Sequence, residues 1–169
     1  MIDKIEALGQ EVETLWQKEA YAKEVFPEIA FKVLQENKLH ERFNLNEFLR
    51  ALWERKGLPK QLSMTNDFGQ PPITFYFNTK QNFLIDIYFW VTPEISIHSH
   101  GFRGAFTVLH GESLQCLYDF DIKEPLDDGA FIGDLSLKKA TLLKKGEVQK
   151  ILPGPAFIHQ VWHIGFPTV

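Results

Sequence analysis

Residues 96–113 read SIHSHGFRGAFTVLHGES, with two histidines one residue apart directly before a run of apolar residues and glycines. In a strand, successive side chains point to opposite faces of the sheet, so Ser96, His98 and His100 share one face. Two imidazoles on one face lie close enough to bind the same metal ion. The pair alone is weak evidence, because strand histidines are also commonly hydrogen-bonded to the backbone or to water. A metal site therefore needs a third ligand from another part of the chain.

A third imidazole comes near the end of the sequence. Residues 146–165 read GEVQKILPGPAFIHQVWHIG, in which a tight Pro-Gly-Pro turn precedes His159, and His163 follows four residues later. A late strand that lies across a barrel from an early one can bring its histidine to the same cavity. Three neutral nitrogen ligands suit Fe, Zn, Cu or Ni and leave positions open for a substrate. A histidine of this late segment can therefore join His98 and His100 at one metal ion.

The composition is that of one ordinary globular domain. The chain has 169 residues, of which 44% are hydrophobic and 24% charged, and its net charge is −4. The charges are mixed along the sequence, so no basic stripe indicates nucleic-acid or membrane binding. The N-terminal residues lack the pattern of a signal peptide. With Cys116 as the single cysteine there is no internal disulfide, and we expect a cytoplasmic location.

The first 58 residues have the periodicity of helices. Apolar residues recur at three- and four-residue spacing in residues 1–17, and a second helical segment contains Pro27, which should kink or restart the helix. Asn44 and Glu47 form a variant capping box before a third helix. We expect residues 1–69 to be a helical region that belongs to the same domain as the remainder.

Residues 70–169 have the pattern of short strands with Gly and Pro at the joints. The predicted strands lie at 73–79, 83–91, 95–100, 105–111 and 113–122, with two or three more after residue 139. Residues 121–134, DIKEPLDDGAFIGD, are interpreted as a loop or a bulged connection. The fold class is therefore mainly β, as a sandwich or small barrel.

Two motifs in the right order resemble those of the cupin superfamily. The stretch HSH followed by GFRGAFTVLHGES resembles the first cupin motif, and GEVQKILPGPAFIHQV is similar to the second. The resemblance covers roughly residue 73 to the C-terminus. It implies a cupin-type jelly-roll β-barrel over residues 70–169, with the N-terminal α-helical region packed on it and a metal inside.

Within the cupins, the chain looks most like the thiol dioxygenases, the group of cysteine dioxygenase. That resemblance implies an Fe(II) site of His98, His100 and His159, with Zn, Ni, Mn or Cu as alternatives. It also implies a small thiol or similar chelating anion as substrate and dioxygen as oxidant. Ala105 stands where most cupins have a metal-binding glutamate, and His163 stands where an asparagine is usual, in the second shell.

Four residues are candidates for contact with the substrate. Arg103 is the nearest cation to the histidines in sequence, although it also suits a surface loop. Ala105 leaves the ion its full charge, or simply leaves room for a bulky substrate. Tyr88 and Trp90 share a face with Asp86 and either line the pocket or belong to the core.

Two other functions remain open at this stage. The chain can be a cupin that binds a metal and a small ligand without catalysis, as a sensor or storage protein. It can also be a metal-free scaffold whose helical N-terminus binds a protein partner, in which case the three histidines are dispersed. We expect no nucleic-acid or membrane partner, and a homodimer is left open.

Overall fold

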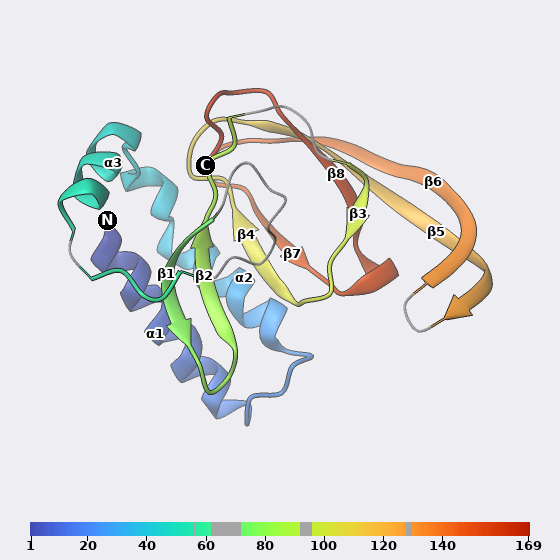
Figure 1. The fold of residues 1–169 in the computed structure, drawn as a ribbon, viewed down its shortest axis with the longest axis horizontal. Coiled ribbons are helices and arrows are strands. Elements are labelled where there is room, and N and C mark those ends of the chain that lie inside the picture. The colour runs from blue at the N-terminus through green and yellow to red at the C-terminus, as the bar shows by residue number, and fades with distance from the viewer. Residues whose placement is uncertain (56, 62–71, 92–95, 128–129) are drawn as a thin grey trace.

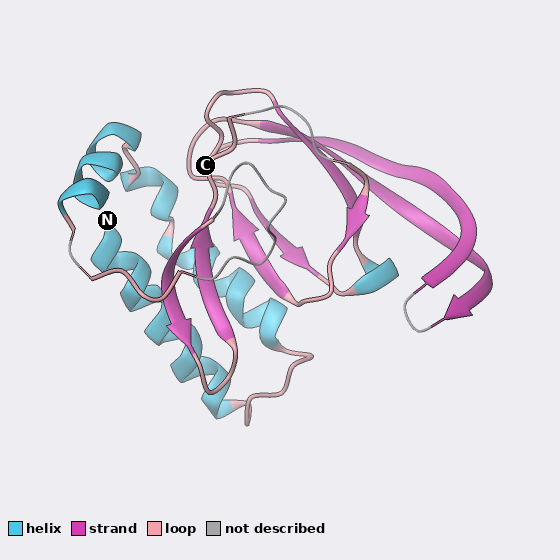
Figure 2. Cartoon of the chain, in the orientation of Figure 1, coloured by secondary structure: helices cyan, strands magenta, loops and turns pink. Residues whose placement is uncertain are grey.

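A computed structural model describes residues 1–55, 57–61, 72–91, 96–127 and 130–169. The α-helices gather on one side of the molecule with the first two strands beside them, most of the other strands lie toward the opposite side, and a long hairpin projects away from the helices (Figures 1 and 2). The predicted boundary between residues 69 and 70 lies outside the described residues. None of the described helices is long and apolar enough to cross a membrane.

The N-terminal region forms three α-helices, as its periodicity predicts. They are α1 (Ile2–Lys18), α2 (Phe26–Asn37) and α3 (Leu45–Glu54), with a 3-10 turn, η1 (Leu39–Arg42), before α3. Pro27 lies in the first turn of α2, where its missing N–H costs no hydrogen bond, so the helix restarts there. The side chain of Asn44 accepts a hydrogen bond from the backbone N–H of Glu47 and caps α3.

The strands form three separate antiparallel arrangements. One pair is β1 (Ile73–Asn78) with β2 (Phe83–Ile87), and another is β4 (Gly104–Thr107) with β7 (Val148–Ile151). The third has four strands in the order β3 (His98–Ser99), β8 (Ile158–His163), β5 (Ser113–Asp127) and β6 (Ala130–Leu143), and a 3-10 turn, η2 (Gly154–Ala156), precedes β8. The prediction of a mainly β fold is confirmed, but none of these sheets closes on itself.

The main apolar core lies between the helices and the first strand pair. Buried residues of α1, α2 and α3 pack against β1 and β2, and Phe48, Phe75 and Ile5 are the largest of those whose side chains are fully buried. Gly9 lets α1 approach the ring of Tyr76 closely, and the Tyr76 hydroxyl donates a hydrogen bond to Glu13. This core contains none of the three predicted metal ligands.

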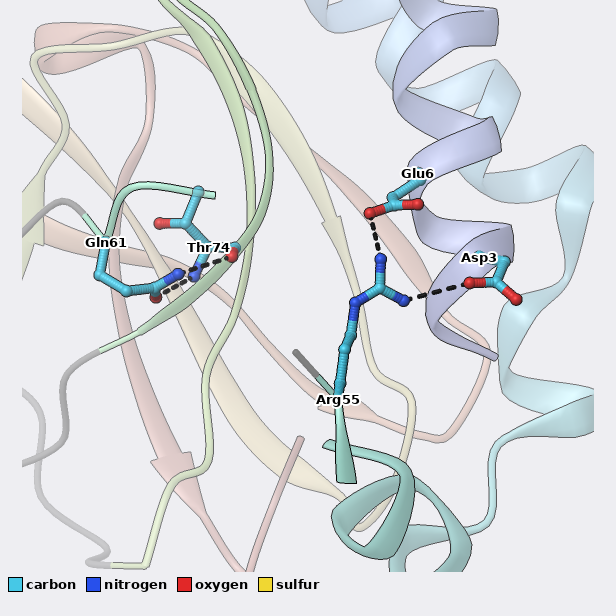
Figure 3. A network of polar contacts seen from close by, with 5 residues as sticks. All are labelled: Asp3, Glu6, Arg55, Gln61 and Thr74. Atoms are coloured by element: carbon cyan, nitrogen blue, oxygen red, sulfur yellow. Dashed lines mark hydrogen bonds and ion pairs between the residues drawn. The ribbon is translucent and has the colours of Figure 1, made fainter. Parts of the chain in front are cut away.

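Polar contacts tie the helices together and continue the first strand pair (Figure 3). The guanidinium of Arg55, after α3, forms ion pairs with Asp3 and Glu6 of α1. The side-chain amide of Gln61 accepts from the backbone N–H of Thr74 at 2.9 Å and donates to its carbonyl at 3.0 Å. Gln61 therefore satisfies the backbone of β1 in the way that a neighbouring strand does.

The interpretation of residues 121–134 as a connection needs correction. These residues belong almost entirely to the paired strands β5 and β6, which form a hairpin much longer than the predicted strand 113–122. The register between the two strands shifts at three places, so the predicted bulges are present inside a continuous ladder. A bulge accommodates an extra residue without ending the pairing, which is why this polar sequence remains in strands.

Candidate metal centre

The three predicted ligands converge in the structure. His98 lies on β3 directly opposite His159 on β8, in the register that pairs the two strands. His100 follows β3, and its carbonyl accepts a hydrogen bond of 2.8 Å from the N–H of Gly154. The Pro-Gly-Pro turn before β8 therefore holds the backbone of one ligand and leads the chain into another.

Two of the distances between the rings fit one bound metal ion. Nε2 of His159 lies 2.9 Å from Nε2 of His100 and 3.1 Å from Nε2 of His98, and the ligand nitrogens all lie within 4.8 Å of one another. Two nitrogens bound at right angles to an ion at about 2.1 Å are about 3.0 Å apart. The two short separations therefore match adjacent positions in the coordination sphere of a first-row metal.

The hydrogen bond of His98 fixes which of its nitrogens is free to bind. Its Nδ1 lies 2.8 Å from the carbonyl oxygen of Ser96, and a carbonyl can only accept, so Nδ1 carries the proton. In the neutral ring the lone pair is then on Nε2, which faces His159. A histidine that binds a metal usually donates its other ring N–H to an acceptor in this way.

Gln115 contacts the corresponding nitrogen of His159, and the sequence analysis missed it. Its amide nitrogen Nε2 lies 3.2 Å from Nδ1 of His159, and both side chains are buried. Since amide oxygen and nitrogen differ only by a flip, Gln115 can turn its oxygen toward Nδ1–H and leave Nε2 free for the metal. The alternation of side chains along β5 was the signal in the sequence that could have pointed to Gln115, because it puts a glutamine among inward-facing residues.

Burial keeps two of these imidazoles neutral. Desolvation lowers the pKa of His159 to about 3, with the neighbouring His98 and His100 adding to the effect. Desolvation, and then His98, lowers the pKa of His100 to about 4. A metal ligand must be unprotonated, so the environment that disfavours imidazolium makes this cluster ready to bind a cation at neutral pH.

Aromatic rings flank the cluster. Phe157 lies against His159 with ring centroids 4.6 Å apart, and Phe102 lies 4.8 Å from His100. His98 and His100 are partly exposed whereas His159 is buried, so the cluster can be reached from solvent on the side of β3. The site thus combines a polar nitrogen face with apolar walls and an open side.

His163 lies on the same face of β8 as His159, about 13 Å further along the strand. Its Nδ1 lies 2.9 Å from the hydroxyl of Ser113, and its ring stacks on Trp90 with centroids 4.7 Å apart. Trp90 stacks in turn on Tyr88 at 5.4 Å. These three rings form a continuous stack. The roles of His163 beside an ion and of Tyr88 and Trp90 beside a substrate stay predictions.

The two remaining candidates lie in different surroundings. Arg103 is exposed between β3 and β4. Ala105 lies on β4, opposite Lys150 of β7, and packs against the apolar core. Within the described residues the histidine cluster includes no Asp, Glu or Cys, as the absence of an acid at position 105 suggests.

Comparison with protein-family models finds none that matches this chain, and comparison with curated proteins likewise finds no match. The centre therefore rests on its own geometry: a group of three histidines that can hold a metal ion, on a mainly β fold.

Proposed function

We propose that this chain is a metal-dependent oxygenase with a cupin-type jelly-roll fold, which oxidises a small thiol or similar chelating anion with dioxygen. His98, His100 and His159 hold the metal, which we propose to be Fe(II). The observation that carries the proposal is the convergence of three imidazoles, in which Nε2 of His159 lies 2.9 Å from Nε2 of His100 and 3.1 Å from Nε2 of His98.

The charge of the ligand set supports an anionic substrate. Three neutral imidazoles leave a divalent ion its full double charge, and no carboxylate in the described part of the cluster cancels it. A thiolate is therefore attracted strongly, more so because the local environment is partly desolvated. When bound, Fe(II) brings substrate and dioxygen together and exchanges electrons between them.

The side chains around the ion have positioning roles. The Ser96 carbonyl holds His98 in the tautomer and orientation that binding requires, and Gln115 does so for His159 when its amide oxygen faces Nδ1. Phe102 and Phe157 place apolar surface beside the nitrogen face, which lowers the local polarity and strengthens the electrostatic attraction for the substrate. A thiol that takes up both atoms of dioxygen becomes a sulfinic acid, and this conversion needs no further reductant.

Oxygen uptake by protein loaded anaerobically with Fe(II) tests the proposal. A panel of small thiols, with and without amino and carboxylate groups, should contain one that is consumed mole for mole with dioxygen and gains two oxygen atoms by mass. Protein loaded with Zn(II) and the variant His159→Ala should be inactive. If protein carrying one iron per chain consumes no dioxygen with any thiol, the oxygenase proposal fails and the non-catalytic metal-binding cupin takes its place.

A further inference from the structure

The β5–β6 hairpin extends well beyond the other strands (Figure 1). The pairing of β5 with β8 places Ser113, Gln115 and Leu117 on the face that carries His159 and His163. The alternate residues of β5 point to the opposite side, away from the metal centre. We call this opposite side the outer face.

The two faces of the hairpin differ sharply in charge. On the inner face, Lys123 forms ion pairs with Asp121 and Asp134, and Lys138 forms one with Asp119. The register of the strands places no charged side chain on the outer face between Leu114 and Ile122. That face comprises Leu114, Cys116, Tyr118, Phe120 and Ile122 of β5, Gly133, Leu135, Leu137, Ala140 and Leu142 of β6, and Ile158, Gln160 and Trp162 of β8.

The polar groups of the outer face already satisfy each other. The Tyr118 hydroxyl donates a hydrogen bond of 3.2 Å to Oε1 of Gln160. The large apolar side chains around them remain 37–59% exposed, namely Ile122, Leu135, Leu137, Leu142 and Trp162. At about 200 Å² for a fully exposed large side chain, these five expose on the order of 450 Å². A contiguous apolar patch of this size on a protein surface marks an interaction site.

We propose that the outer face packs against the outer face of a second copy of this chain, related by a two-fold axis. A standard interface buries about 800 Å² per partner, and this patch with its half-buried neighbours supplies most of that area. Each chain carries a net charge of −4, so two copies repel one another in general. The uncharged outer face lets them approach with the least repulsion.

Packing face to face fits this hairpin better than pairing of the two β6 edges. Within the described residues β6 pairs only with β5, so its other edge is free. That edge carries Lys138, at a bulge, and Lys139, and both lysines and bulges are devices that prevent strands from pairing edge to edge. A face of one chain packed on the same face of another is self-complementary, as a two-fold axis requires.

Leu137→Lys and Ser136→Lys form a matched pair of variants for the test. The two residues are neighbours on β6 and lie on opposite faces of the hairpin. Sedimentation velocity over a range of concentrations should show that the wild-type chain forms a species of twice its 19.6 kDa mass. In Leu137→Lys the dissociation constant should rise by roughly 100-fold or more, because each dimer then buries two ammonium groups. Ser136→Lys should dimerise like the wild type.

Circular dichroism and metal content should be unchanged in both variants, since neither residue belongs to the core or the histidine cluster. The proposal is overturned if the wild-type chain stays monomeric up to about 200 µM. It is also overturned if Leu137→Lys dimerises as tightly as the wild type, or if Ser136→Lys raises the dissociation constant as much as Leu137→Lys does. The outcome is independent of whether the chain oxidises thiols.

Discussion

Gln115 is a polar neighbour of the buried His159. Its amide contacts the ring nitrogen of His159 that faces away from the other two imidazoles. Gln115→Leu removes this hydrogen-bond partner and should weaken metal affinity by about 10–100-fold, whereas Gln115→Glu supplies a carboxylate acceptor and should retain the affinity. Titration of Co(II) in competition with a chelator measures the difference.

Gln160→Leu is the matched control for this substitution. Gln160 is the next residue after His159, but its side chain lies on the outer face and contacts Tyr118. Metal affinity should stay at the wild-type value in this variant. Equal affinities of the Gln115→Leu protein and the wild type would show that His159 needs no partner at Nδ1.

His163 should make the stability of the protein depend on pH. Burial lowers its pKa from 6.5 to about 4, so between these values the unfolded chain binds a proton that the folded chain does not. Stability therefore falls as the pH drops from 6.5 to 4, by up to about 3 kcal/mol from this group. Urea unfolding of His163→Gln at pH 7 and pH 4.5 should show a smaller loss than in the wild type. An identical loss would mean that His163 does not titrate in this range.

Single residues were predictable where strand alternation alone decides their direction. His98 and His100 share a face because they are two apart, and a second histidine-bearing strand was evident from the Pro-Gly-Pro turn. Alternation along β5 marks Gln115 as inward-facing, but its contact with His159 depends on the register of β5 against β8, which the sequence does not specify. The tautomer of His98 likewise depends on a carbonyl that only the folded chain brings near.

At the scale of elements, α1 approaches β1 closely at Gly9. A methyl group built on Gly9 would lie 2.4 Å from Cγ of Tyr76, near the rigid base of the ring. Replacing a helical glycine by alanine usually stabilises a helix by about 1 kcal/mol. Here Gly9→Ala should instead destabilise the protein by about 1–3 kcal/mol, because α1 must move away from β1. Thermal unfolding shows whether Gly9→Ala stabilises or destabilises the protein, and Gln10→Ala on the exposed side of α1 is the control. A higher melting temperature for Gly9→Ala than for the wild type would contradict this packing.

The elements were predictable where capping or periodicity marks them. Pro27 and Asn44 indicate the starts of α2 and α3 because each residue type suits a first turn. The far end of the β5–β6 hairpin, residues 121–134, was predicted to be a connection because Pro125, the acidic residues and the glycines there have turn-like composition. Pairing between the two strands and the bulges that absorb extra residues overrides that local preference.

At the scale of the whole molecule, the apolar core and the candidate metal centre are separate. The core joins the three helices to β1 and β2, whereas the histidines lie on β3, after it and on β8. The chain should therefore remain folded without metal, and loss of a ligand should affect binding rather than the fold. The sequence predicts one closed cupin barrel. The described strands instead form three separate sheets, so the barrel stays a proposal.

The most direct test of the metal centre is the number of ions bound per chain in the wild type and in His98→Ala, His159→Ala and His110→Ala. His110 lies outside the cluster and serves as the control. After anaerobic incubation with Fe(II) and removal of excess ion, elemental analysis should give one ion per chain in the wild type and in His110→Ala. Both cluster variants should lose stoichiometric metal while their far-ultraviolet circular dichroism stays that of the wild type. Full metal retention in His98→Ala or His159→Ala, or a wild-type chain that binds none, would contradict the account.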